Sequence, residues 1–397
     1  MKILKNTTVL LVLAVILGII LGMILPESLM NVVLIIKQVT GQLIFFLVPL
    51  IIFGFVAPSI AQLSGNVSKL LLFVFCIAYL SSIGAAFFGA GVSYVVVPML
   101  DIPQLEQGRA LPELPFQLEI PPLMSVMTAL VIAVFIGLGS IWVDKAIEKN
   151  EAAERLGKKN YIKPLLNQFQ HIVLLLVKNL LIPMLPFYIA CNFAALSYQG
   201  SVSAFTVFLP ILVCVILCHY IWLALLYGLA SANSGKNGWQ VLRYYGPAYM
   251  TALGTMSSAA TLGVALECAA KSPILDKKVR EFAIPLFSNI HLCGSILTEV
   301  FFITVVSQLI YGHMPDFGTL SFFIVLLGMF AIGAPGVPGG TVLASLGIVI
   351  SVLQFDDAGT ALLLAIFALQ DSFGTACNVT GDGALTLITT KFATTNK

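Results

Sequence analysis

The chain has 397 residues, of which 59% are hydrophobic and 10% are charged, and its net charge is +2. This composition excludes an ordinary soluble globular protein and indicates several membrane-spanning helices. The basic residues are dispersed, so nucleic acid is not an expected partner. The cysteines lie mostly in apolar segments, so no disulfide framework is expected.

Apolar runs long enough to cross a bilayer, which takes about 20 helical residues, recur along the chain. The first run follows a basic N-terminus but has no small-residue cleavage site after it. We therefore interpret it as a transmembrane helix rather than a signal peptide. We predict spans at residues 7–26, 31–62, 68–99, 122–143, 164–196, 203–231, 283–310 and 358–390.

Two further apolar regions, 242–270 and 318–354, are interrupted at their centres by small or helix-breaking residues. The first turns at Ser257 and Ser258, and the second at "GAPGVPGG" (333–340). Arms of about a dozen residues are too short to span. Two broken hairpins in matching positions point to a transporter binding site near the middle of the membrane, with two kinked helices as the alternative.

The loops differ in charge. The linker at 144–163 is basic, whereas the linker at 101–119 is acidic. In membrane proteins the cytoplasmic loops have an excess of lysine and arginine. The loops of this chain follow that rule if each hairpin enters and leaves the membrane on the same side. We expect both termini in the cytoplasm and a multi-pass protein of the cell membrane, which in a bacterium is the inner membrane.

The last predicted span carries an unusual set of polar residues. Asp371, Thr375, Asn378 and Asp382 are spaced by four, three and four residues, which places them on one stripe of a helix. Interhelical hydrogen bonding would explain the threonine or the asparagine alone. Two carboxylates favour a site for a cation or an ammonium group, because a charge inside a membrane is retained where it pairs or binds something.

The serine-tipped hairpin, the "GAPGVPGG" hairpin and the final "DSFGTACNVTGD" helix together resemble the dicarboxylate/amino acid:cation symporter family, which includes transporters of glutamate, aspartate and neutral amino acids. The resemblance covers essentially the whole chain and is nearest to the bacterial serine/threonine transporter branch. It implies an all-α fold of eight transmembrane helices plus two re-entrant helical hairpins, a homotrimer in the lipid bilayer, and an elevator mechanism.

The resemblance also implies two domains. A scaffold would comprise residues 1–65 (helices 1 and 2) and 101–202 (an outside loop and helices 4 and 5). A mobile transport domain would comprise residues 66–100 (helix 3) and 203–397 (helices 6 to 8 and both hairpins).

The family's substrate-binding positions carry over to matching residues here. Asp371 would accept the substrate ammonium group, Asn378 would reach its α-carboxylate, and the amide groups at the tip of the first hairpin would bind that carboxylate as helix N-termini bind anions. The implied substrate-binding residues are Ser257, Ser258, Ser295, Gly336, Val337, Thr341, Asp371, Thr375 and Asn378.

Two departures from the family bear on the substrate. Members that take acidic substrates have an arginine before the threonine of the last helix, where this chain has Gly374. Other members have an arginine before the hairpin serines, where this chain has Met256. Without an arginine to bind a second carboxylate, we expect a small neutral amino acid as substrate. A carrier of dicarboxylates or acidic amino acids is the alternative, which the negative charge of Asp371 disfavours.

The ion sites depart as well. The family pattern "NMDGT" reads "HLCGS" (291–295) here, so Cys293 replaces an aspartate, and a thiol is a poor ligand for a hard cation. We expect Na⁺ as coupling ion, with H⁺ in addition or instead. Glu299 and His291 are the candidate proton carriers. The candidate ligands of the coupling cation are Asn378, Asp382, His291, Ser81 and Ser82.

Other classes fit less well. An intramembrane aspartyl protease would need Asp371 and Asp382 to share a water molecule, but helical rise separates them by about 16 Å. A channel would have the same composition and is distinguished by the absence of saturable uptake. Cys214, Cys218 and His219 have a loosely metal-like spacing, which we interpret as core packing. We therefore expect a transporter rather than an enzyme.

Overall fold

The computed structural model describes residues 7–61, 69–100, 111–112, 114, 118–148, 159–199, 208–334 and 339–395. All regular structure in these residues is helical, and they contain no strand. Six segments within them are long and apolar enough to cross a membrane: Glu27–Pro58, Lys69–Met99, Ile162–Ala195, Phe208–Ser234, Lys277–Tyr311 and Asp357–Thr395. The prediction of an all-α membrane protein is confirmed at this level.

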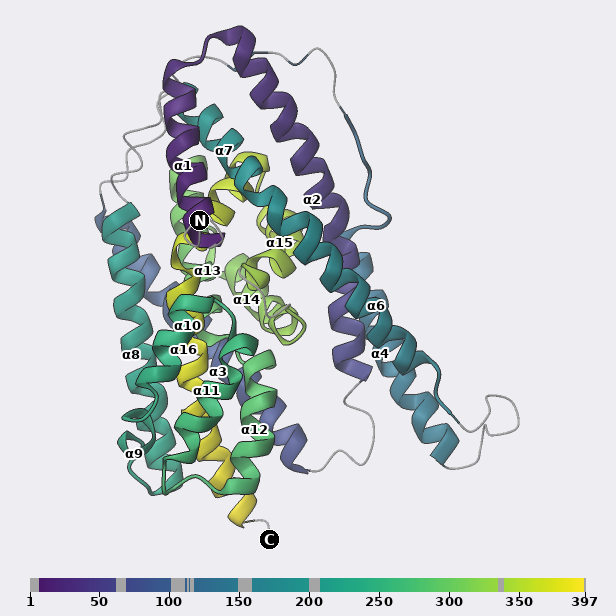
Figure 1. The fold of residues 1–397 in the computed structure, drawn as a ribbon, viewed down its shortest axis with the longest axis vertical. Coiled ribbons are helices and arrows are strands. Elements are labelled where there is room, and N and C mark those ends of the chain that lie inside the picture. Colours follow the sequence, from purple (N-terminus) through teal and green to yellow (C-terminus); the bar gives the residue numbers. More distant parts are fainter. Residues whose placement is uncertain are drawn as a thin grey trace.

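One group of helices forms the upper and right-hand part of Figure 1. Within it, α1 packs along α7, and α2 packs against α4, α6 and α7. The close approach of α1 to α7 requires glycine, because a Cβ on Gly22 would overlap with Ala194 O. The elements are α1 (Thr7–Ile24), α2 (Glu27–Ala61), α4 (Val126–Glu148), α6 (Ile162–Leu176), the π-helical turn η3 (Val177–Leu181) and α7 (Ile182–Tyr198).

A second group surrounds α16, which packs against α8, α10, α12 and α13 (Figure 1). Two pairs of short helices, α10 with α11 and α14 with α15, pack as hairpins. The elements are α3 (Lys69–Val96), η2 (Val97–Met99), α8 (Phe208–Ser234), α9 (Trp239–Leu242), α10 (Gly246–Thr255), α11 (Ser258–Ala270), α12 (Lys277–Ile290), α13 (Cys293–Tyr311), α14 (Phe317–Ile332), α15 (Gly340–Leu353) and α16 (Asp357–Thr395).

The centre of this second group is the most enclosed part of the described chain. The most apolar window of Lys277–Tyr311 is entirely buried inside the protein and that of Asp357–Thr395 is 83% buried, whereas the window of Lys69–Met99 is only 33% buried. The polar residues of α13 and α16 therefore face protein rather than lipid, as functional polar residues in membranes do.

One predicted span is not a continuous helix. The segment predicted at 283–310 breaks between α12 and α13, at His291 and Leu292. His291 has extended backbone angles (φ −108°, ψ 101°), and the Leu292 amide donates to Ser82 Oγ over 3.3 Å. The neighbouring helix α3 thus supplies an acceptor for a backbone N–H that the break leaves without its helical partner. Broken helices of this kind occur in membrane proteins where the backbone lines a binding site.

Candidate functional site

The first hairpin turns at Met256, which has a left-handed backbone (φ 50°) and a buried side chain. Ser257 follows as the N-cap of α11, and its Oγ accepts from Ala260 N over 3.2 Å. The amide groups of Ser258 and Ala259 have no acceptor in the described part of the chain. The first turn of α11 therefore offers two free N–H donors, as predicted for a carboxylate-binding helix end.

The broken span supplies a second helix N-terminus. Asn378 Oδ1 accepts from Gly294 N over 2.7 Å and from Ser295 N over 3.2 Å, and Asn378 Nδ2 donates to Ser295 Oγ over 2.9 Å. The amide of Asn378 thus caps α13, which fixes its orientation. One N–H of Nδ2 remains for a ligand, because an amide nitrogen has two hydrogens.

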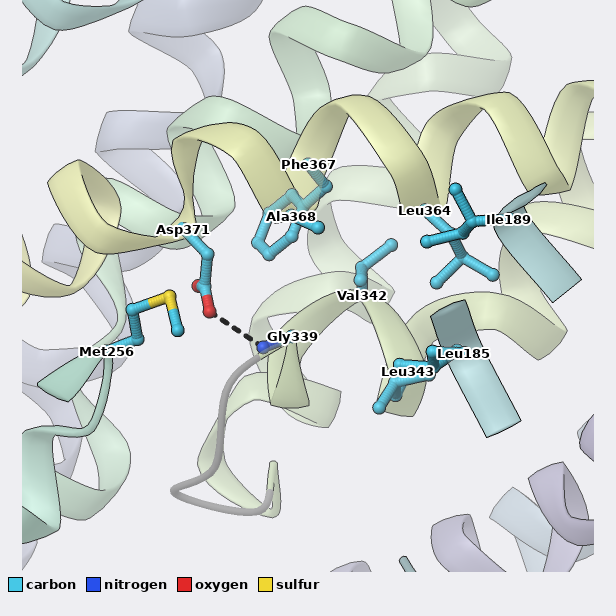
Figure 2. A pocket seen from close by; sticks show the side chains of 10 residues that line it. All are labelled: Leu185, Ile189, Met256, Gly339, Val342, Leu343, Leu364, Phe367, Ala368 and Asp371. Carbon is cyan, nitrogen blue, oxygen red and sulfur yellow. Dashed lines mark hydrogen bonds between the residues drawn. The ribbon is translucent and has the colours of Figure 1, made fainter. Parts of the chain in front are cut away.

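The second hairpin is tied to α16 by a carboxylate. Asp371 Oδ2 accepts from Gly339 N over 2.7 Å, at the start of α15 (Figure 2). Gly339 has a left-handed backbone (φ 71°), which glycine adopts without strain. The second carboxylate oxygen, Oδ1, has no hydrogen-bond partner among the described residues, so it is available to a ligand.

These helix ends surround one pocket, and the predicted substrate-binding residues converge on it. Six of them line it: Ser258, Ser295, Thr341, Asp371, Thr375 and Asn378. Ser257, the N-cap of α11, is not a lining residue, although its sequence neighbours Met256 and Ser258 are. Gly336 and Val337 lie outside the residues that the structure describes. Five further lining residues were not among those predicted to bind substrate: Ser288, Asn289, Leu292, Ala334 and Gly340, of which Ala334 and Gly340 belong to the "GAPGVPGG" stretch of the second hairpin.

The described lining of the pocket is acidic. Among its described lining residues, Asp371 is the sole ionisable side chain. Met256, where an arginine would lie in some members, also lines the pocket and faces Asp371 in Figure 2. On the far side of Asp371, a second, apolar pocket includes Leu185 and Ile189 of α7, so the two helix groups meet beside this carboxylate.

The predicted ion ligands form a separate network deeper in the protein. His291 Nδ1 donates to Asp382 Oδ1 over 2.9 Å, and His291 Nε2 lies 2.9 Å from Ser81 Oγ. Ser82 contacts the same break through Leu292 N. Ser81, Ser82, His291 and Asp382 are thus brought together. For Asn378 the predicted ion ligand is its carbonyl, and its side chain binds α13. The described residues hold no group of three or more His, Cys, Asp or Glu suited to a metal ion.

Asp382 keeps one oxygen free. Within the described part of the chain, neither its buried Oδ2 atom nor the buried hydroxyl of Tyr245 has a hydrogen-bond partner. Both Tyr227 and Tyr245 interact electrostatically with Asp382, and both rings border on Gly383, beside it in α16. A bare carboxylate oxygen in an apolar interior is costly unless a cation or a donor reaches it.

Glu299 is completely buried in α13. Its Oε1 atom contacts the hydroxyl of Ser345 in α15, while Oε2 has no hydrogen-bond partner in the residues that the structure describes. The hydroxyl of Ser345 also lies 3.1 Å from Val342 O. Since a hydroxyl has one hydrogen, both contacts are satisfied when Ser345 donates to Val342 O and a protonated Glu299 donates to Ser345.

His219 of α8, which the sequence led us to interpret as core packing, makes specific hydrogen bonds to α13. His219 Nε2 lies 3.1 Å from Gly294 O and 2.8 Å from Thr298 Oγ1. A carbonyl oxygen accepts only, so Nε2 carries the hydrogen, and Nδ1 has no hydrogen-bond partner in the described chain. His219 therefore supports the turn of α13 to which Asn378 binds. The sequence feature that could have indicated this role is a histidine within an otherwise apolar span.

Comparisons with known proteins agree with this arrangement. A model of the sodium:dicarboxylate symporter family matches residues 8–392. The human excitatory amino acid transporter 1 is 30% identical over 184 residues, which are 46% of this chain and 32% of that protein.

Two further relatives match over shorter stretches. The mouse excitatory amino acid transporter 3 is 31% identical over 40% of this chain and 30% of its own length. An excitatory amino acid transporter of Caenorhabditis elegans is 29% identical over 37% of this chain and 29% of its own length. The chain thus spans about a third or less of the curated relatives it matches.

Proposed function

The chain belongs to the sodium:dicarboxylate symporter family, and we propose that it is a cation-coupled symporter of small neutral amino acids. The observation that carries the proposal is a pocket with a single carboxylate, the N-termini of α11, α13 and α15, and no basic side chain among its described lining residues. Such a pocket matches one ammonium group and one carboxylate group, the two charges that every amino acid zwitterion has.

Each charge has a partner in the pocket. The substrate ammonium group would bind Asp371 Oδ1, while Oδ2 keeps its hydrogen bond to Gly339. The α-carboxylate would bind the free amide groups of Ser258 and Ala259 and the remaining N–H of Asn378. A charge-assisted hydrogen bond of this kind is stronger than a neutral one. Asp371 would then connect the substrate to the second hairpin.

The side chain of the substrate would face Thr341, Thr375 and Met256, none of which is charged. A second carboxylate would find no cation there and would lie near Asp371. A carrier of acidic amino acids or dicarboxylates is the second candidate. It is favoured by the names of the relatives, which are excitatory amino acid transporters, and disfavoured by the lining of this pocket.

Na⁺ is the coupling ion that family membership supports, and we propose Asp382 as one of its ligands. The free Oδ2 atom is a hard oxygen ligand, as an alkali cation requires. The contact of Glu299 with Ser345 supports a proton as a second coupling ion, since the hydrogen count there fits a protonated carboxyl group.

The two helix groups support the proposed division into a scaffold (1–65 and 101–202) and a transport domain (66–100 and 203–397). Gly333, before the tip of the second hairpin, contacts the backbone of Phe55, roughly 9 Å along α2 from Ala61. Lys37, about 15 Å along α2 from Glu27, interacts with Asp357 at the start of α16. These two contacts support a position of the proposed transport domain toward the Ala61 end of α2.

In the proposed topology, with eight spans and cytoplasmic termini, the Ala61 end of α2 is cytoplasmic. The pocket then lies near the inner side of the scaffold, which agrees with the inward position of an elevator transporter. We include the homotrimer and a place in the cell membrane, the inner membrane in a bacterium, in the same proposal.

Uptake by purified protein in proteoliposomes tests the function. We expect saturable uptake of serine, threonine or alanine under an inward Na⁺ gradient, with weak competition by aspartate and succinate. Preferential uptake of aspartate or succinate would support the second candidate. Non-saturable flux without substrate dependence would indicate a channel and overturn the proposal.

A further inference from the structure

A cavity of about 320 Å³ lies where the first turns of α3 and α12 meet the last turns of α16. It shares no lining residue with the substrate pocket. The proposed topology puts this end of the protein at the cytoplasmic side of the membrane. The lining residues are Lys69, Leu70, Asp276, Lys278, Val279, Phe392, Ala393 and Thr394.

Much of the cavity wall consists of apolar side chains that pack against neighbouring residues. Val279 is buried, and Phe392 stacks on Phe73 with ring centroids 3.9 Å apart and ring planes at 3°. Leu70 and Ala393 complete the apolar surface. A hydrated inorganic ion gains nothing from such a wall, whereas the glycerol and acyl part of an amphiphile does.

The polar part of the cavity is basic. Lys69 and Lys278 have no acidic partner among the described residues. The one acidic residue in the lining, Asp276, is the N-cap of α12, and its Oδ1 accepts from Val279 N over 3.1 Å. Lys277, Arg280 and Lys391 are neighbours in sequence of the lining residues and add positive charge at the same end.

We propose that this cavity binds the headgroup of an anionic phospholipid of the cytoplasmic leaflet. The phosphate lies between the ammonium groups of Lys69 and Lys278, and the glycerol backbone and first acyl carbons lie against Leu70, Val279 and Phe392. Basic pockets between helices on the cytoplasmic side of membrane proteins recognise such headgroups, and that leaflet is rich in anionic lipid. The site does not depend on the proposed substrate.

Lipid retention measures binding directly, without any transport assay. Purified protein in a neutral detergent is incubated with phosphatidylglycerol or with phosphatidylcholine, and bound lipid is counted by native mass spectrometry. We expect one tightly held phosphatidylglycerol per chain and a clear preference over phosphatidylcholine. In the double variant Lys69→Gln/Lys278→Gln that preference falls roughly fivefold for each lysine removed.

The matched control is Lys236→Gln/Lys271→Gln, which removes the same charge from the same end of the protein but outside the cavity; here the preference changes less than twofold. Ala393→Phe, which fills the cavity without changing charge, also abolishes retention. If both double variants lost the preference for phosphatidylglycerol equally, the preference would arise from general surface charge, and the proposed site would be overturned. Competition by free glycerol phosphate as strong as that by the lipid would identify a soluble anion instead, and would also overturn it.

Discussion

His219 and Gly294 connect two helices directly behind the substrate pocket: His219 Nε2 donates to Gly294 O over 3.1 Å. The amide of the same glycine donates to Asn378 Oδ1 over 2.7 Å. A single residue of α13 is therefore held from α8 on one side and from α16 on the other. The position of Asn378 in the pocket depends on a histidine that does not line the pocket itself.

Replacing His219 by Phe should therefore raise the KM for the substrate about fivefold, the value of one lost hydrogen bond, with little change in maximal rate. His219→Gln keeps a donor and should restore most of the affinity. Uptake kinetics of both variants, with His171→Phe at an exposed position of α6 as control, give the measurement. A KM unchanged in His219→Phe, or equally poor in both His219 variants, would contradict a positioning role.

Asp371→Asn should weaken substrate binding by about 10- to 100-fold, because an ammonium group loses its charged partner. The asparagine oxygen can still accept from Gly339 N, so the tie to the second hairpin is kept. Binding of radiolabelled serine to detergent-purified protein measures the loss, and size-exclusion chromatography checks that the variant keeps the size of the parent. A variant that binds as the parent does would show that the ammonium group lies elsewhere.

Met256→Arg should shift preference toward aspartate by at least about tenfold, since a buried guanidinium beside Asp371 would pair with a second carboxylate. The left-handed backbone at 256 already carries a side chain, so arginine adds no new strain there. Competition of aspartate against labelled serine in proteoliposomes is the measurement. If aspartate gains nothing, the side chain of the substrate does not face Met256.

Position 374, where acidic-substrate members have their arginine, is a poorer place for the same test. A Cβ on Gly374 would lie 3.2 Å from Ser295 Cα, within the contact between α16 and α13. Gly374→Arg should therefore lower thermal stability in addition to any change of specificity, because the close packing of the two helices has to open.

Asp382→Asn should weaken Na⁺ dependence and substrate affinity together, since coupling between two ligands is reciprocal. The remaining carbonyl oxygen can still accept from His291, so the change removes charge with little loss of structure. Tyr245→Phe should weaken Na⁺ activation several-fold when the Tyr245 hydroxyl binds the same ion. Tyr249→Phe is the control and should leave Na⁺ activation unchanged, because the hydroxyl of Tyr249 pairs with that of Tyr220. Sodium titrations of uptake that coincide for Asp382→Asn and the parent would make the carboxylate purely structural.

Glu299→Gln mimics the protonated carboxyl group, because the glutamine amide has an N–H that can donate to Ser345 Oγ, as a protonated carboxyl group would. The variant should exchange substrate at the parent rate but lose stimulation by an inward proton gradient. Counterflow and gradient-driven uptake, measured side by side, separate the two activities. His291→Asn tests the other candidate carrier in the same assays. Proton stimulation that persists in both variants would leave Na⁺ as the sole driving ion.

Much of the candidate site could be predicted from the sequence because one helix carries it. Asp371, Thr375 and Asn378 share a stripe by helical spacing alone, and all three line one pocket. The break at His291 could not be predicted in this way. At the break, the hydroxyl oxygen of Ser82 in α3 accepts a hydrogen bond from Leu292 N. A contact between such distant segments produces no periodic pattern of residues in the sequence.

The donors on the first hairpin were predictable for a related reason: a serine followed by a helix is an N-cap signal, and Ser257 is the N-cap of α11. His219 shows the opposite case. Its sequence neighbours suggested packing, and its partner Gly294 has no side chain from which a contact could be anticipated.

The tie between Asp371 and the second hairpin is made to the backbone of Gly339, not to a side chain. A scan that replaces each residue of the hairpin by alanine would therefore leave the donor in place everywhere and would register no loss of this bond. Any effect at position 339 would instead report the strain of a Cβ at φ 71°. Removing the amide hydrogen itself, by replacing the peptide bond with an ester at that position, is the change that would reveal what the contact contributes to closing the hairpin.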